Sequence, residues 1–196
     1  MQNTSLSLLT RLRNTADQPA WDRLIELYAP LLQRWCRSYG VQQADADDLV
    51  QEVLTTITRE LPRFEHNQRT GAFRAWLRVI FVNRLRRFWE QRGGAMVAVG
   101  GSSALERLQE LADDASAASR LWDAEHDQYV IAKLLNSIQP HFQPKTWQAF
   151  QRQVFDGQRA DQVAAELGMP LSSVYVARNR VLSALRREAA GLVDSV

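Results

Sequence analysis

The segment Asp45-Ala-Asp-Asp-Leu-Val-Gln-Glu52 holds four acidic residues within eight positions. On a helix, the 3.6-residue repeat places Asp48, Gln51 and Glu52 on one exposed face. Such a face suits docking to a basic protein surface, although a run of charges on a helix is most often its solvated side. The carboxylates also have the chemistry of Mg²⁺ ligands in a nuclease. The residues alone leave these three interpretations open.

Arginine and aromatic residues are interleaved between positions 73 and 89. Arginine neutralises phosphate and exposed rings stack on unpaired bases, which is the chemistry of single-strand nucleic-acid capture. Aromatic residues at helical spacing are more often a buried stripe, so we expect most of these rings to lie in the core. The arginines are Arg74, Arg78, Arg84, Arg86 and Arg87, and the aromatic residues are Phe73, Trp76, Phe81, Phe88 and Trp89.

The segment from Arg159 to Glu188 has the pattern of two helices joined by a tight turn. Gly168 suits the left-handed conformation that ends the first helix, Met169-Pro170 supplies the turn, and Ser172 or Ser173 is expected to cap the second helix. Apolar spacing in that helix predicts an inner face of Val174, Ala177, Val181 and Leu185. The opposite face is expected to expose Tyr175, Val176, Asn179, Arg180, Ser183, Arg186 and Arg187, whose polar members can bond phosphates and base edges. The pattern favours a DNA-binding helix-turn-helix over a plain αα-hairpin.

Residue types that support catalysis lack the necessary spacing. His66, His126 and His141 are far apart, and each is interpreted as a surface or loop histidine rather than a metal ligand. Cys36 lies on an apolar helix and is expected in the core. No Gly-rich phosphate loop, Gly-x-Ser-x-Gly or His-Glu-x-x-His occurs. We therefore expect no enzyme activity, no metal and no cofactor.

The elements that must position these residues are predicted to be helices throughout. Apolar periodicity predicts a helix over 21–38, a second that begins after Asp45 or Asp47 and ends at Pro62, and a third over 73–89. Residues 64–72 are polar and predict a loop. The predicted fold class is all-α, with two small helical domains joined by a flexible acidic linker. The domains span 1–92 and 122–196, the linker spans 93–121, and the second domain contains the helix-turn-helix. Within the linker, Leu105, Leu108 and Leu111 have the spacing of a short acidic helix that ends before Asp113.

Composition and charge narrow the class of protein. The chain has 196 residues, 45% hydrophobic and 23% charged, which is typical of a soluble globular protein. Its net charge of +2 conceals +4 over 1–92, −4 over 93–140 and +2 over 141–196. This distribution predicts two polyanion-facing domains joined by an acidic connector. With no secretory signal, no apolar run long enough for a membrane helix and a single cysteine, we expect a cytoplasmic protein that contacts no membrane.

Three segments resemble bacterial RNA polymerase sigma factors of the extracytoplasmic-function (ECF) group. Residues 45–52 are close to that group's Asp-Ala-Glu-Asp-Leu-Val-Gln-Glu signature. Phe73-Arg-Ala-Trp-Leu-Arg-Val-Ile-Phe-Val-Asn83 is similar to its promoter-melting segment, Phe-x-x-Trp-Leu-x-x-Ile-x-x-Asn. The C-terminal helices resemble the domain that reads the −35 element, and the run Val-Tyr-Val-Ala-Arg-Asn-Arg-Val-Leu most resembles planctomycete members. The three matches occur in the right order, with a linker between them.

The resemblance implies a partner or a role for each segment. Core RNA polymerase would bind through its β′ clamp helices and β flap, promoter DNA would be the nucleic acid, and an anti-sigma factor is a further partner to test. The implied polymerase-binding residues are Asp45, Asp48, Gln51 and Glu52. Loop 64–72 would hold a base flipped from the −10 element, and the implied −10 and melting residues are His66, Asn67, Arg69, Phe73, Trp76, Asn83, Arg84 and Arg87. The implied −35 residues are Ser172, Ser173, Tyr175, Val176, Asn179 and Arg180.

A second function class also fits the helix-turn-helix. A transcriptional regulator that is not a polymerase subunit would use its N-terminal half as a sensor or partner domain. It would bind duplex DNA tightly by itself and would usually be a symmetric dimer. A sigma factor would bind promoters weakly alone and strongly as holoenzyme, so binding to core polymerase discriminates the two hypotheses.

Overall fold

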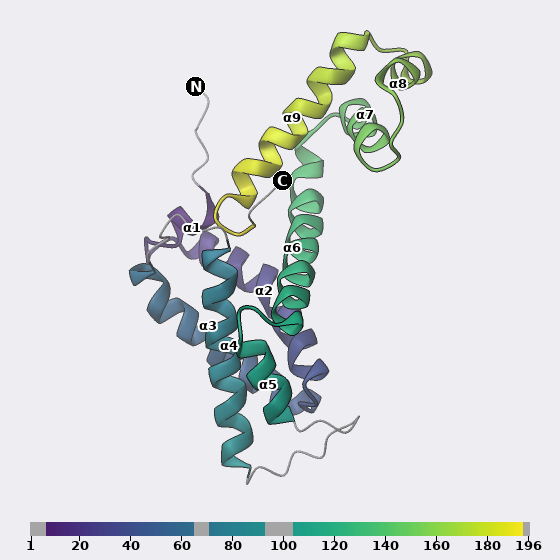
Figure 1. Ribbon diagram of the computed structural model, residues 1–196. Helices are drawn as coiled ribbons and strands as arrows, with labels where there is room; N and C mark the ends of the chain where they lie inside the picture. Colours follow the sequence, from purple (N-terminus) through teal and green to yellow (C-terminus); the bar gives the residue numbers. More distant parts are fainter. Residues whose placement is uncertain (1–6, 65–70, 93–103, 194–196) are drawn as a thin grey trace.

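The computed structural model describes residues 7–64, 71–92 and 104–193, and over these ranges the chain is helical (Figure 1). In chain order the helices are α1 (Leu8–Arg11), α2 (Gln18–Ser38), α3 (Gln43–Glu60), η1 (Leu61–Arg63), α4 (Ala72–Gln91), α5 (Ala104–Ala112), α6 (Ala117–Ile138), η2 (Gln139–His141), α7 (Pro144–Val154), α8 (Ala160–Leu167) and α9 (Leu171–Ala189). The described residues contain no strand, only an isolated bridge between Ala190 and Val193. The predicted all-α class is confirmed.

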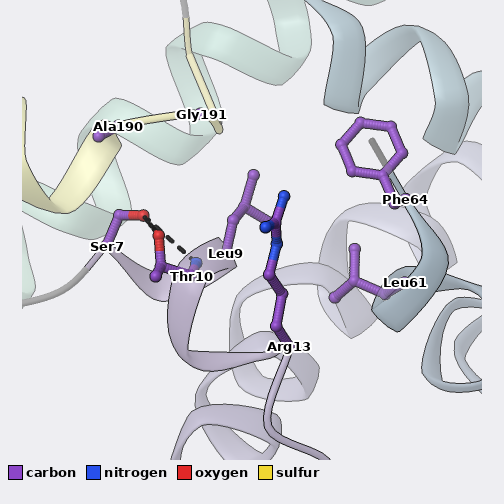
Figure 2. Close-up of a pocket in the computed structure, with 8 residues that line it drawn as sticks. All are labelled: Ser7, Leu9, Thr10, Arg13, Leu61, Phe64, Ala190 and Gly191. Carbon is purple, nitrogen blue, oxygen red and sulfur yellow. Dashed lines mark hydrogen bonds between the residues drawn. The ribbon is translucent and has the colours of Figure 1, made fainter. Parts of the chain in front are cut away.

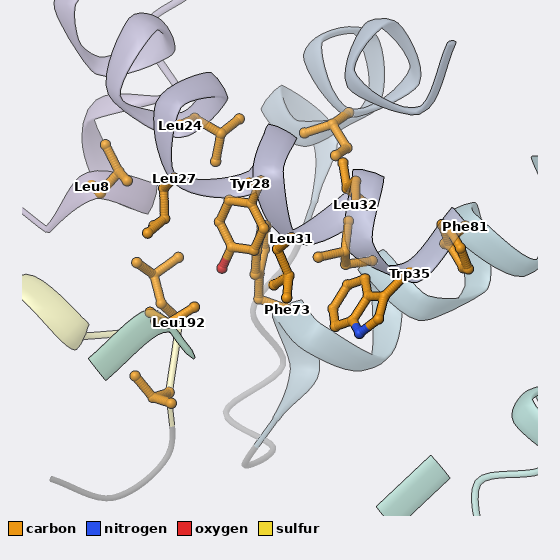
Figure 3. Close-up of a cluster of buried hydrophobic side chains, with 14 of the residues drawn as sticks. Leu8, Leu24, Leu27, Tyr28, Leu31, Leu32, Trp35, Phe73, Phe81 and Leu192 are labelled. Carbon is orange, nitrogen blue, oxygen red and sulfur yellow. The ribbon is translucent and has the colours of Figure 1, made fainter. Parts of the chain in front are cut away.

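Helices α2, α3 and α4 form a bundle around one apolar core. Tyr28, Leu31 and Leu32 on α2 are fully buried, and Figure 3 shows them gathered with Phe73 and Phe81 of α4. The Tyr28 and Phe73 rings meet edge to face with centroids 5.6 Å apart, a favourable arrangement for aromatic pairs. The apolar residues that the periodicity placed on one face of each helix thus pack together in a shared core.

Helix α3 begins earlier than the sequence predicted. Its first residue is Gln43, the cap residue Gln42 makes no side-chain cap bond, and Asp45 lies inside the first turn. The expected cap at Asp45 or Asp47 is therefore wrong. The Asp45 carboxylate is used elsewhere, because it accepts a hydrogen bond from Arg92 at the end of α4. An acidic side chain in the first turn still favours the helix through its dipole.

Helix α4 carries apolar residues on more than one side. Phe73, Leu77 and Phe81 are fully buried, and Val82 and Leu85 extend the buried surface round the helix. This explains the two apolar stripes visible in its sequence. The helix is enclosed by α3 on one side and by α5 and α6 on another. It can therefore bury apolar side chains on more than one side while leaving a narrower face to solvent.

The short helix predicted within the linker is α5, and residues 117–121 are also helical, where a flexible linker was expected. Leu108 and Leu111 of α5 are buried, and α6 starts at Ala117 with Ser116 as its cap, 2.9 Å from the Ser119 amide. Helix α6 crosses the predicted boundary at 121/122, and Figure 1 shows it running from the α2–α5 bundle toward α7 and α8. The remainder of the predicted linker, 93–103, lies outside the described residues.

The packing of α5 and α6 is extensive enough to make them part of the bundle. Trp122 and Val130 are buried, like Leu108 and Leu111. Burying one large apolar side chain stabilises a fold by roughly 1.5–3 kcal/mol, so four contribute about 6–12 kcal/mol before chain entropy is counted. The division of the chain into units at 1–92 and 122–196 stays a prediction.

The C-terminal helices use two cores. A small cluster of Ala149, Val163, Val174 and Ala177 joins α7, α8 and the first half of α9. The second half of α9 joins the main core, because Val181, Leu185, Ala189, Leu192 and Val193 are buried there. An ion pair of 2.9 Å between Arg23 on α2 and Glu188 adds a polar contact at this junction. Helix α9 thus presents its first half on a small unit and anchors its second half in the bundle.

Candidate functional site

The acidic face predicted on α3 exists. Asp48, Gln51 and Glu52 are exposed, while Leu49, Val50 and Val53 point into the core and fix the rotation of the helix. Asp45 differs from these three, because it is half-buried and paired with Arg92. The exposed carboxylates are available to a basic partner, whereas Asp45 ties the start of α3 to the end of α4.

Phe73 lies in the core. It is fully buried, with ring centroids 5.6 Å from Tyr28 and 6.0 Å from Phe64. Phe73 was implied as a −10 and melting residue, but aromatic neighbours cover its ring, so it cannot contact DNA directly in this structure. Trp76 is half-buried beside Phe64, with centroids 4.9 Å apart, and keeps part of its surface accessible. His66, Asn67 and Arg69 of the predicted loop lie outside the described residues.

A polar cleft separates α3 from the second half of α4. It has a volume of about 400 Å³ and is lined by Asp45, Asp48, Leu49, Glu52, Arg84, Arg87, Phe88, Gln91 and Arg92. Arg84 donates a 2.8 Å hydrogen bond to the Thr56 hydroxyl and lies 3.8 Å from a Glu52 oxygen. Arg84 thus links the predicted docking face to α4. Asn83 and Arg87 are exposed, as a nucleic-acid contact requires.

Arg74 and Arg78 are not available to phosphate in this arrangement. Arg78 is buried, and it pairs with Asp123 at 2.9 Å and with Asp114. Arg74 pairs with Asp127 at 2.6 Å and Asp123 at 3.2 Å. We call Asp114, Asp123 and Asp127 the acidic clasp. The sequence suggested that all five arginines of α4 neutralise phosphate. For Arg74 and Arg78 this prediction is wrong, because both are paired with aspartates.

His126 is buried, contrary to its interpretation as a surface histidine. Its Nε2 lies 3.1 Å from the Tyr28 hydroxyl and its Nδ1 lies 2.8 Å from an Asp127 oxygen. Burial, together with the Asp127 carboxylate, raises the pKa of Tyr28 well above its usual range. The tyrosine therefore stays protonated. No local pattern indicated this contact, since Tyr28 and His126 are 98 positions apart.

Cys36 is buried and unpaired, as the sequence predicted. Burial raises the pKa of its thiol to about 12, so the nucleophilic thiolate is strongly disfavoured in the folded chain. In the unfolded chain the thiol ionises near its ordinary pKa of about 8.5, so stability falls as pH rises above that value.

We expect the native Cys36 thiol to resist a disulfide reagent at about pH 8, where an exposed cysteine reacts readily. In guanidinium chloride the same thiol should react completely. Stopped-flow thiol titration measures both rates. Equal rates for the folded and unfolded chain would contradict the burial of Cys36.

The C-terminal helix-turn-helix has the predicted local geometry. Gly168 ends α8 in the left-handed conformation at φ 57°, and the predicted inner face of α9 is buried. The cap differs from the prediction, because α9 starts at Leu171 after Pro170 and neither serine caps it. Ser172 is exposed and Ser173 half-buried. The predicted outer face is exposed at Tyr175, Val176, Asn179, Arg180, Ser183, Arg186 and Arg187.

The outer face of α9 borders a cleft that the sequence did not predict. The cleft has a volume of about 610 Å³, and α9 contributes Val176, Asn179, Arg180, Ser183, Ala184 and Arg187 to it. Its other wall is the segment from the end of η2 to the first turn of α7, with His141, Phe142, Gln143 and Thr146. Polar residues around Pro144 were the available signal. They mark a helix start, whose amide groups favour anions.

A smaller cavity of about 340 Å³ lies where α1, η1 and the C-terminal segment meet (Figure 2). Leu9, Leu61 and Phe64 supply its apolar lining, and the side chain of Arg13 extends along it. Of the residues predicted to form a site, its described lining includes Phe64 alone, the first residue of loop 64–72.

The described residues contain neither a group of metal-binding side chains nor a membrane-spanning helix. In these parts of the chain, no three histidine, cysteine or acidic residues are grouped as metal ligands would be. No described helix combines the length and the apolar character that crossing a membrane requires.

Comparison with known proteins finds a family model that matches most of the α2–α4 bundle. Residues 24–94 match Sigma-70 region 2. The region 2 match begins inside α2, covers α3 and α4, and so contains both the acidic face and residues 73–83. The helix-turn-helix and the acidic clasp lie outside it.

Two curated relatives agree with the region 2 match. The chain is 32% identical over 78 residues to RNA polymerase sigma factor NccH of Alcaligenes xylosoxydans xylosoxydans, which is 40% of each chain. It is 30% identical over 78 residues to RNA polymerase sigma factor CnrH of Cupriavidus metallidurans, which is 40% of this chain and 39% of the relative. The similarity thus spans about two fifths of the length of these relatives.

Proposed function

We propose that the chain is an ECF-type sigma factor that binds core RNA polymerase and directs promoter-specific initiation. The observation that carries the proposal is the region 2 match over 24–94, in a chain that also holds a helix-turn-helix. Either feature by itself, the region 2 match or the helix-turn-helix, would favour this function much less than the two together.

The exposed acidic face of α3 is the proposed polymerase-docking surface. Asp48, Gln51 and Glu52 would contact the β′ clamp helices, and Asp45 would act through its pair with Arg92. Complementary charge steers association and fixes orientation. The C-terminal unit would contact the β flap. An anti-sigma factor would be a competing partner for these surfaces.

The exposed side of α4 is the proposed −10 surface. Trp76, Asn83 and Arg87 remain at least partly accessible, and Arg84 lies in the cleft beside them. Extruding a base costs a few kcal/mol of unstacking, which stacking on Trp76 and hydrogen bonds from Asn83 would offset. Loop residues His66, Asn67 and Arg69 would complete this surface.

The outer face of α9 is the proposed −35 reader. Asn179 and Arg180 have the donor groups that recognise base edges in the major groove, and half-exposed Val176 can pack on a thymine methyl. Ser172, Ser173 and Tyr175 would contact the backbone near the start of the helix. The proposed protein is cytoplasmic, has no catalysis of its own, and is most like planctomycete members.

The test is binding of the purified chain to bacterial core RNA polymerase. Reversing two docking charges, Asp48→Arg with Glu52→Arg, should weaken binding about 100-fold or more, because like charges then face each other across the interface. Fluorescence anisotropy of a labelled chain measures both affinities.

A matched variant controls for net charge. Asp22→Arg with Glu26→Arg makes the same charge change on the exposed side of α2 and should leave binding unchanged. If a folded wild-type chain fails to bind core polymerase but binds duplex DNA tightly, the regulator hypothesis replaces the sigma factor.

A further inference from the structure

The acidic clasp joins α4 to a part of the chain outside the region 2 match. Asp114 precedes α6, and Asp123 and Asp127 lie on its first half, whereas their partners Arg74 and Arg78 lie on α4. Thirty-six to 53 positions separate the hydrogen-bonded partners in sequence. The clasp is therefore a tertiary contact between the start of α6 and α4, the helix that carries the proposed −10 surface.

The clasp and the proposed DNA surface occupy opposite faces of α4. Each residue turns a helix by about 100°, so Asn83 lies about 180° from Arg74 and about 140° from Arg78. Arg78 is 3% exposed, whereas Asn83 and Arg87 are exposed. The aspartates therefore do not cover the face of α4 that would meet DNA. This argues against the idea that they mimic DNA phosphates and block that face.

The anchoring of α6 argues against a displaceable lid. Trp122 stacks on Trp35 with ring centroids 3.3 Å apart, and it also contacts Phe81 at 5.1 Å. His126, between the two clasp aspartates of α6, hydrogen-bonds to the Tyr28 hydroxyl. Residues that flank the clasp are thus built into the core, so its aspartates have a fixed frame from which to hold α4.

We propose that the acidic clasp is a positioning element for promoter opening. It holds Arg74 and Arg78 and thereby sets the rotation of α4, so that Trp76 and Asn83 meet the −10 strand. The inference rests on the proposed function. It deepens that function by assigning a role in opening to residues that never touch DNA.

The experiment uses holoenzyme assembled from full-length chain and bacterial core polymerase, with a promoter that wild-type holoenzyme selects from a DNA library. The main variant is Asp123→Asn with Asp127→Asn, and the milder variant is Asp114→Asn, at a side chain that is 83% exposed. The control, Glu110→Gln with Asp156→Asn, removes two exposed charges elsewhere. Permanganate reactivity of −10 thymines measures the opening rate.

We expect the main variant to open the promoter about tenfold more slowly or worse, since small misplacements of reacting groups have effects of this size. Its affinity for core polymerase should change by less than about twofold, because the proposed docking face on α3 keeps all of its side chains. A promoter already melted at −10 should restore activity, which a general loss of folding would not allow. The exchange Arg74→Asp with Asp127→Arg should recover part of the opening rate that Arg74→Asp alone removes.

Three results would overturn the inference. The first is that both clasp variants open the promoter at the wild-type rate. The second is that a clasp variant opens the promoter faster, or binds DNA more tightly, than wild type. The third is that the main variant loses as much activity on a pre-melted promoter as on duplex DNA. If wild-type holoenzyme neither assembles nor selects a promoter, the proposed function itself fails, which is a distinct outcome.

Discussion

Replacing Trp122 with alanine is expected to destabilise the chain by about 3–5 kcal/mol, the usual range for a buried tryptophan. Trp122 is 3% exposed and packs between Trp35 and Phe81. Alanine removes both ring contacts and leaves a cavity where α6 crosses the bundle. Urea unfolding followed by circular dichroism gives the free energy of unfolding.

The neighbouring residue supplies the control for this experiment. Leu121 is 62% exposed, so Leu121→Ala should change the free energy of unfolding by less than about 0.5 kcal/mol. Trp122→Phe should cost less than Trp122→Ala, because it keeps a ring and removes an indole N–H that has no hydrogen-bond partner in the described structure. Equal stability of Trp122→Ala and wild type would show that α6 does not belong to the bundle.

The second large effect is expected on the outer face of α9. Replacing Asn179 and Arg180 with alanine should weaken holoenzyme binding to a promoter with its −35 element, by about 1–3 kcal/mol for each base-reading side chain that is removed. That is roughly five-fold to 150-fold for each residue. Electrophoretic mobility shift with holoenzyme at fixed salt measures the change.

The preference for one −35 sequence over another distinguishes side chains that read bases from those that only contact phosphates. The Asn179 and Arg180 variants should relax discrimination between −35 sequences, whereas Arg159→Ala, an exposed arginine before α8, should weaken all sequences alike. An unchanged −35 preference in the double variant would contradict the assignment of this face as the reader.

The helices and their exposed faces were predictable from sequence because they depend on short-range periodicity. The rotation of α3, set by Leu49 and Val53, exposes Asp48 and Glu52 as the spacing predicted. The same reasoning placed Val174 and Ala177 inside and Asn179 outside on α9. Such patterns repeat every three or four residues and need no knowledge of distant partners.

The contacts that the sequence missed all join distant positions. Helical spacing predicted that most rings of α4 are buried, but nothing local indicated that Phe73 would pack against Tyr28 or that His126 would reach the Tyr28 hydroxyl. The start of α3 was also misplaced, because Asp45 pairs with Arg92, 47 positions later, instead of capping the helix. Capping preferences are weak, and a tertiary ion pair can override them.

The sequence by itself determined the helical class, the two exposed faces and the turn at Gly168, because each follows from local pattern and backbone preference. Only the tertiary structure decided which charges on α4 face solvent. Arg78 and Arg87 are alike in sequence, yet Arg78 is buried against the aspartates of the clasp and Arg87 is exposed. The reason is physical: a buried charge must be paired, and for Arg78 the balancing carboxylates come from a distant part of the chain.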